Sequence, residues 1–309
     1  MSVDVDLAEH LGSLDAHVRN EFSAMPEVVD AGEDLDLSKI PIEARRWVRI
    51  EDVVAVVADL KGSTNLGTGT QREASTASIY EASTHPLVNT FATFSADDIA
   101  IQGDGAFGVF WGDMRYERAI CAGITIKTFS EKSLETRLEK KWPDLETGFK
   151  VGIASSRVLV KRVGLPRTDH YEEVWAGKAV NYAAKASQDA DRRELIVTGS
   201  VWDQIGKNDF VAYTCGCHNG PGDSIWHDVT IGRLPEDDPE REGRKLTSSW
   251  CDNCGPAFCE AILAGRTARP EVDGLRAASQ AALMKNAIRS IALQERENRR
   301  NLRIARTGR

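Results

Sequence analysis

The sequence predicts an α+β fold in which a mixed sheet carries helices on one face. Three observations support this prediction. An unbroken apolar run at residues 53–58 is typical of a strand buried on both faces. Two runs in which apolar residues alternate with small or polar residues flank Gly-Asp-Gly at 103–105, and this pattern indicates a hairpin. Helical periodicity fills the intervening and following segments, at residues 71–94, 115–129 and 131–141.

The composition is that of a globular protein with a sizeable core. Of 309 residues, 41% are hydrophobic and 28% charged, and 39 basic against 47 acidic residues give a net charge of −8. This balance argues against nucleic-acid binding. No apolar run approaches the ~18–20 residues of a transmembrane helix, and the N-terminus lacks a signal-peptide pattern. We therefore expect a cytoplasmic protein that binds neither membranes nor nucleic acid directly.

The N-terminal segment, residues 1–46, begins with a predicted amphipathic helix. Its apolar residues recur at helical spacing, as a docking face would require; they are Leu7, Leu11, Leu14, Val18 and Phe22. In the later helix at 71–94, Pro86 predicts a break or restart.

The second half of the main domain, which we place at residues 47–205, continues the same pattern. Alternation at 149–153 predicts a strand that turns at Ser155-Ser156-Arg157 into another strand at 158–163. Residues 177–190 predict a helix and 195–198 a strand. The C-terminal extension, residues 206–309, holds a charged loop at 235–243 that we expect to be exposed, and a basic tail at 285–309.

Two aspartates stand at the ends of predicted strands. Asp59 ends the buried run and Asp104 lies at the hairpin tip. Either one alone would fit a turn residue. Because strands in such a sheet are neighbours, the two carboxylates can converge, and they repel unless they share a proton or bind a cation. Hard oxygen ligands favour Mg²⁺ or Mn²⁺, and two such ions can serve phosphoryl transfer.

Two further motifs accompany these aspartates. The turn Lys61-Gly62-Ser63-Thr64 leads from the strand towards a helix and would offer backbone N–H groups to phosphate oxygens, although no Walker loop is present. Asn181 and Lys185 are one helical turn apart and therefore share a helix face. Taken alone, these motifs would fit a common loop, a helix cap and a solvated lysine.

In this order and spacing, the motifs resemble the class III nucleotidyl cyclases over residues 47–205. The matching segments are VAVVADLKGST (54–64), AIQGDGAFGVF (100–110), KVGIASSRV (150–158) and WAGKAVNYAAKAS (175–187). The resemblance implies a ferredoxin-like mixed sheet, here with an N-terminal helix and a Cys-rich C-terminal extension. It also implies a homodimer in which each site combines metal ligands of one chain with transition-state residues of the other.

The resemblance assigns a role to each motif. The implied positions are Asp59, Leu60 and Asp104 for two Mg²⁺ or Mn²⁺ ions, Gly62, Ser63 and Thr64 for phosphate, and Asn181 and Lys185 for the transition state. Lys185 stands where the family has an arginine. Lysine keeps the positive charge but cannot donate the two parallel hydrogen bonds of a guanidinium group.

The base-reading positions depart from those of purine cyclases. Ala100 replaces the adenine-selecting lysine, and the base-reading aspartate corresponds to Val174, or to Glu173 if one insertion is allowed near Trp175. Adenine's polar edge would then lose partners worth about 1–3 kcal/mol each. The pattern is most similar to the pyrimidine cyclases of bacterial anti-phage Pycsar systems, which favours UTP first and CTP second. Tyr80 and Trp175 are candidates for packing against the ring.

The extension also contains a possible structural zinc site. The candidate ligands have CxCH and CxxC spacing, with Cys259 and His227 nearby; they are Cys215, Cys217, His218, Cys251 and Cys254. Buried free thiols and redox chemistry remain open alternatives.

The leading hypothesis is an enzyme that converts UTP to 3′,5′-cyclic UMP and pyrophosphate, with the product read by a separate effector in anti-phage defence. A cytidylate or purine (adenylate) cyclase is one alternative. A degenerate cyclase domain with a regulatory or dimerising role is another, favoured weakly by Lys185. A GGDEF-type synthetase ranks last, because the full motif is missing.

Overall fold

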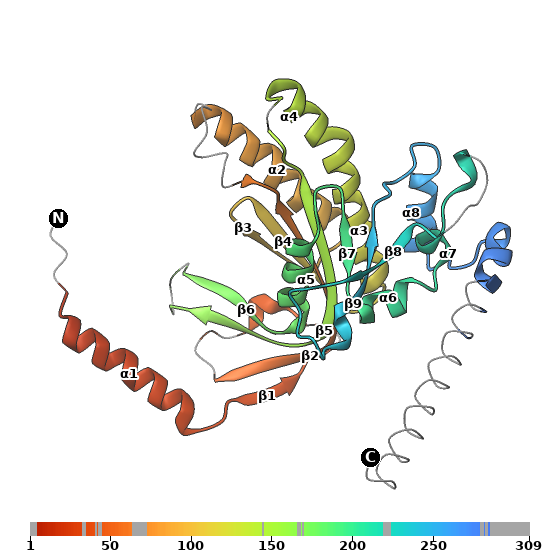
Figure 1. Ribbon diagram of the computed structural model, residues 1–309. Coiled ribbons are helices and arrows are strands. Elements are labelled where there is room, and N and C mark those ends of the chain that lie inside the picture. The colour runs from red at the N-terminus through yellow and green to blue at the C-terminus, as the bar shows by residue number, and fades with distance from the viewer. Residues whose placement is uncertain are drawn as a thin grey trace, which may run out of the picture.

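The computed structural model describes residues 5–32, 35–40, 42, 45–63, 73–143, 145–165, 168, 170–218, 224–278, 281 and 284. Within these residues, one nine-stranded sheet has the order β3-β4-β2-β5-β7-β9-β8, with β1 beside β2 and β6 beside β5 (Figure 1). The strands are β1 (Glu27–Asp30), β2 (Arg46–Leu60), β3 (Asp98–Gln102), β4 (Gly105–Phe110), β5 (Phe149–Gly164), β6 (Tyr171–Gly177), β7 (Leu195–Val197), β8 (Trp226–Thr230) and β9 (Glu242–Leu246). The predicted mixed α+β sheet is confirmed.

Helices cover both faces of this sheet, so the expectation of one covered face is wrong. The helices are α1 (Leu7–Ser23), α2 (Glu73–Thr93), α3 (Arg115–Phe129), α4 (Thr136–Lys141), α5 (Lys178–Asp189), α6 (Gly199–Ile205), α7 (Asp209–Ala212) and α8 (Gly255–Leu263). The first core packs α2 and α3 against Val54, Val56 and Ala58 of β2. The second core packs α5 against Val53 and Ala55, which point the other way because side chains alternate along a strand.

Two predicted breaks are absent. Pro86 lies inside the continuous helix α2. Proline cannot donate to the carbonyl of Ala82, which sits on the exposed side of the helix, where water can satisfy it. The predicted turn at Ser155–Arg157 is part of the unbroken strand β5. The two serine hydroxyls in this strand form hydrogen bonds with residues far along the sequence. Ser155 Oγ lies 2.9 Å from Ser200 Oγ, and Ser156 Oγ accepts from Ala179 N at 2.8 Å.

The predicted helices at 115–129 and 131–141 are joined by a π-helical segment, η3 (Ser130–Glu135). Four short 3₁₀ segments complete the described elements: η1 (Leu37–Lys39), η4 (Gly216–His218), η5 (Pro239–Arg241) and η6 (Pro270–Val272). None of the helices in the described part of the chain is long and apolar enough to cross a lipid bilayer.

Helix α1 and the C-terminal extension differ in their relation to the sheet. Helix α1 forms where predicted, but it stands apart from the sheet (Figure 1), and its apolar stripe from Leu7 to Phe22 is exposed. Strands β8 and β9 of the extension continue the sheet beyond β7, with Leu195 opposite Leu246. The boundary near residue 205 therefore stays a prediction, because the sheet runs across it. The tail at 285–309 lies outside the described residues.

Candidate active site

The first aspartate ends the central strand. Asp59 lies opposite Lys150 in the β2–β5 ladder, and Lys150 Nζ is 2.8 Å from Asp59 Oδ2. Strand alternation points Asp59 to the face that α5 covers, while the neighbouring Leu60 side chain is buried in the opposite core. Leu60 could therefore reach a metal only through its backbone carbonyl. Sequence analysis missed Lys150, although a basic residue opposite a carboxylate is visible once the register is known.

The second aspartate sits beside the first because of a close approach between β2 and β4. Ala58 pairs with Ala106, and a Cβ on Gly105 would lie 2.6 Å from Ala58 O and 3.3 Å from Asp59 Cα. Gly103 has φ +64°, as a two-residue hairpin turn requires at its first position. The strands thus bring Asp104 to the end of β2, as the sequence predicted.

Asp104 has one buried oxygen atom, Oδ2, for which the described residues offer no hydrogen bond. A buried carboxylate oxygen without a partner is costly unless a cation or ligand satisfies it. Two carboxylates with hard oxygen donors fit Mg²⁺ or Mn²⁺.

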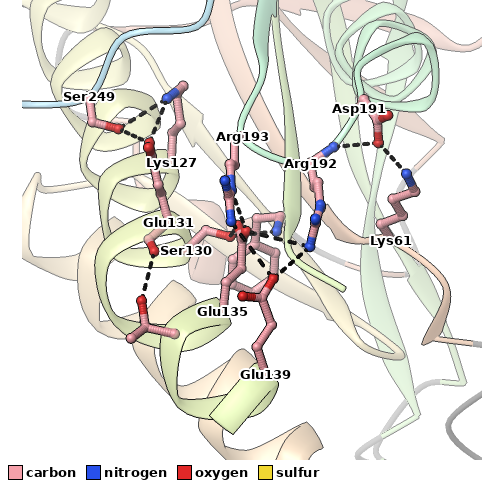
Figure 2. Close-up of polar contacts among 12 residues, drawn as sticks. Lys61, Lys127, Ser130, Glu131, Glu135, Glu139, Asp191, Arg192, Arg193 and Ser249 are labelled. Carbon is pink, nitrogen blue, oxygen red and sulfur yellow. Dashed lines mark hydrogen bonds and ion pairs between the residues drawn. The ribbon is translucent and has the colours of Figure 1, made fainter. Parts of the chain in front are cut away.

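The turn after β2 is held from two sides. Gly62 has φ +72°, which favours glycine, and Lys61 N donates to Gly148 O at 3.0 Å. Thr147 Oγ1 donates to Lys61 O at 2.7 Å, and Lys61 Nζ lies 2.6 Å from Asp191 Oδ1 (Figure 2). Of the predicted phosphate-binding residues, Gly62 and Ser63 are described, and Thr64 lies outside the described residues.

Figure 2 shows how the loop that follows α5 is fixed. Arg193 Nε donates to Glu135 Oε2 at 2.6 Å, and Arg192 Nη1 donates to Glu139 Oε1 at 2.9 Å. Glu135 is fully buried and also accepts from Ser130 Oγ at 2.8 Å. Because the same loop carries Asp191, these contacts connect the phosphate-turn residue Lys61 to η3 and α4.

Asn181 and Lys185 lie on the side of α5 that faces away from the sheet. The buried residues of α5 are Ala179, Tyr182, Ala183, Ala186 and Ser187. Asn181 Nδ2 donates to Gly177 O at 3.0 Å, and Lys185 Nζ lies 5.4 Å from the centre of the Tyr182 ring. Among the described contacts, none joins either residue to Asp59 or Asp104.

Two of the three predicted base-pocket residues, Ala100 and Trp175, lie on the α5 face of the sheet. Ala100 on β3 and Trp175 on β6 belong to the second core, where the rings of Trp175 and Trp111 make a tilted contact with their centres 5.8 Å apart. Asp98, two residues before Ala100, accepts a hydrogen bond from Trp175 Nε1 at 3.0 Å. Burial, together with the nearby charge of Glu173, raises the pKa of Asp98. Sequence analysis missed Asp98, because nothing local distinguishes it from other strand residues.

The register of β6 separates the two candidates for the family's base-reading aspartate. Trp175 pairs with Val160 and Glu173 with Arg162, so Glu173 and Trp175 share a face. Val174 is on the other face and is 40% exposed. Tyr80 packs against the first core from α2, so the structure does not bring it together with Trp175.

A second cluster lies in the C-terminal extension, away from these residues. The ligand sulfurs of Cys215, Cys217, Cys251 and Cys254 lie within 4.8 Å of one another. His218 is not part of this group, and His227 stands on β8 opposite Lys245.

The fold is similar to that of nucleotidyl cyclases of known structure. Adenylyl cyclase CyaB of Pseudomonas aeruginosa aligns with a TM-score of 0.50 and 14% identity over 65% of this chain and 95% of that one. No family model matches.

Two relatives with similar sequences show which family of nucleotidyl cyclases the chain belongs to. A uridylate cyclase of Micromonospora echinofusca is 56% identical over 96% of this chain and 97% of its own length. A second uridylate cyclase, from Propioniciclava tarda, is 46% identical over 97% of this chain and 98% of its own length. The chain belongs to the uridylate cyclase family, and the expected resemblance to nucleotidyl cyclases is confirmed.

Proposed function

We propose that this chain converts UTP to 3′,5′-cyclic UMP and pyrophosphate. The observation that carries the proposal is the convergence of Asp59 and Asp104 at one end of the sheet, beside the glycine turn at Gly62. The names of both full-length relatives support uracil as the base.

In the proposed reaction, the ribose 3′-oxygen attacks the α-phosphorus, and the bond from this phosphorus to the oxygen that bridges to the β-phosphate breaks. Pyrophosphate leaves with that oxygen, and the 3′-hydroxyl proton passes to water. Asp59 and Asp104 would hold Mg²⁺ or Mn²⁺, and such an ion would lower the pKa of the hydroxyl and offset phosphate charge. The backbone N–H groups of Gly62 and Ser63 orient the triphosphate. Asn181 and Lys185 donate to the phosphate oxygens that gain charge in the transition state.

The proposal includes a homodimer with shared sites, as the resemblance to class III cyclases implies. Asn181 and Lys185 face outward from α5, where a second copy could present its own Asp59 and Asp104. The exposed apolar stripe of α1 offers further surface for association of the two copies.

The base pocket supports a pyrimidine. Ala100 has no polar side chain with which to read adenine. Uracil instead offers an N–H between two carbonyl groups, and Asp98 is a carboxylate on the same strand face that can accept it. Anti-phage defence through a separate effector of cyclic UMP is a further part of this proposal, supported by the resemblance to Pycsar cyclases.

The test is product analysis. The purified protein is incubated separately with UTP, CTP, ATP and GTP plus Mn²⁺, and products are identified by mass spectrometry; we expect cyclic UMP to dominate. Asp59→Asn and Asp104→Asn should each lower turnover by about 10²-fold or more, while the exposed control Asp113→Asn keeps it. Equal use of ATP and UTP, or an active Asp104→Asn variant, would contradict the proposal.

A further inference from the structure

The four clustered cysteines reach one point from two separate segments. Cys215 and Cys217 flank the start of η4, and Cys251 and Cys254 form the turn that leads into α8. In a tetrahedral zinc–thiolate centre with Zn–S bonds of about 2.3 Å, the sulfurs lie about 3.8 Å apart. The observed limit of 4.8 Å between all ligand atoms is therefore close to that arrangement.

Both segments are fixed independently of the cluster. Before Cys215, the buried Arg269 donates from Nη1 to Thr214 O at 3.0 Å. Before Cys251, Trp250 N donates to Thr128 Oγ1 and Trp250 Nε1 to Thr125 Oγ1, each at 3.0 Å, on α3. Since neither segment must be ordered by the metal, little conformational entropy opposes binding.

The surroundings of the cluster suit a metal–sulfur centre. Backbone N–H groups of Cys254 and Asn253 donate to the sulfur of Cys251. The cluster also borders an apolar cavity of about 280 Å³ lined by Phe210, Ile225 and Phe258.

We propose that Cys215, Cys217, Cys251 and Cys254 bind one Zn²⁺ ion as a structural centre. Four protein sulfurs leave no open position for substrate, which distinguishes this centre from a catalytic zinc. Zinc would link the segment at Cys215, which Arg269 holds, to the segment at Cys251, which is held on α3. The ion would thereby connect the C-terminal extension to the side of the sheet that α3 covers. This role is independent of the proposed nucleotide substrate.

The experiment is metal analysis of the full-length protein by inductively coupled plasma mass spectrometry. We expect one zinc per chain in the unmodified protein. Cys254→Ser should lose most of it, and the matched control Cys259→Ser should keep it, because the Cys259 thiol hydrogen-bonds with Cys121 on α3 instead. Iron in place of zinc, or no bound metal, would overturn the proposal.

A second measurement needs no variant and remains informative if Cys254→Ser fails to fold. An organomercurial that blocks thiols is titrated into the unmodified protein with a chromogenic zinc indicator. One zinc should be released as the four clustered thiols react. Cobalt substitution should give the visible absorption of a tetrahedral cobalt–thiolate centre. Thiols that react without releasing zinc, or a disulfide within the cluster, would refute the site.

Discussion

Lys150 Nζ lies 2.8 Å from Asp59 Oδ2, across the ladder between β5 and β2. The lysine side chain is 16% exposed and the aspartate 38%, so the pair sits at the edge of the site. Lys150 therefore occupies an oxygen that a metal ion would also use. A cation that binds Asp59 must compete with this ammonium group.

Replacing Lys150 by glutamine should remove this competitor. A partly exposed ion pair is worth about 0.5–1 kcal/mol, so the Mn²⁺ concentration for half-maximal activity should fall about two- to fivefold. The measurement is initial rate against Mn²⁺ at saturating nucleotide. Lys161→Gln, further along β5, is the control and should leave the curve in place. An increased metal requirement in Lys150→Gln would contradict competition.

Shared active sites predict complementation between inactive variants. Asp59→Ala and Lys185→Ala each disable both sites of their own homodimer. After random subunit exchange, half of the dimers are mixed and each restores one of two sites, so about one quarter of the normal activity should return. The control mixture, Asp59→Ala with Asp104→Ala, carries both defects on the metal side and should stay inactive. Equal activity of the two mixtures would rule out sharing.

Most strands and helices of the catalytic segment could be predicted because their signals are local, but strand β6 was missed. The apolar run before Asp59 and the glycines beside Asp104 define a strand and a hairpin, and pairing then brings the carboxylates together. The CxC and CxxC spacings likewise identified the clustered cysteines, although His218 was an unnecessary addition.

The remaining errors concern contacts between distant segments. Ser155 and Ser156 resemble a turn, but their hydroxyls are satisfied by Ser200 and by the backbone of Ala179, which no local pattern reveals. The contact of Asp98 with Trp175 joins residues 77 positions apart, and it depends on the register of β6.

A lysine at Ala100 should impair use of UTP. The new ammonium group would enter the second core near Asp98 and Glu173 and form ion pairs with them. If uracil then loses one hydrogen-bond partner, kcat/KM should fall about tenfold, which corresponds to about 1.4 kcal/mol. Ile101→Lys is the matched control, because Ile101 points to the other face and is 59% exposed. Similar losses in both variants would argue against a base pocket at Ala100.

Asp98→Asn should alter the choice between pyrimidines. The amide oxygen can still accept from Trp175 Nε1, but the amide NH₂ would face the uracil N–H, donor against donor. Cytosine presents an acceptor at that ring position. The ratio of kcat/KM for UTP to that for CTP should therefore fall about tenfold. The exposed neighbour Glu172→Gln removes a nearby charge and should leave the ratio unchanged. An unchanged ratio in Asp98→Asn would exclude it as a base reader.

Asp238 stabilises helix α5, which carries Asn181 and Lys185. Its Oδ2 atom accepts from Lys178 Nζ at 2.7 Å and from Tyr182 Oη at 2.6 Å, both on α5. These hydrogen bonds, first from Lys178 and then from Tyr182, lower the pKa of Asp238 from 3.8 to about 2. A lowered carboxyl pKa stabilises the folded state above the unfolded value, and this contribution disappears as the pH falls towards the folded value.

Asp238→Asn should therefore lower the free energy of unfolding near neutral pH by about 1–2 kcal/mol. The difference from the unmodified protein should shrink as the pH falls from about 4 towards 2, where the native carboxyl becomes protonated. Urea unfolding at a series of pH values measures this difference. Asp237→Asn, the exposed neighbour, is the matched control and should have little effect at any pH. A deficit in Asp238→Asn that stayed constant down to the lowest pH would show that shape, rather than charge, makes the contact.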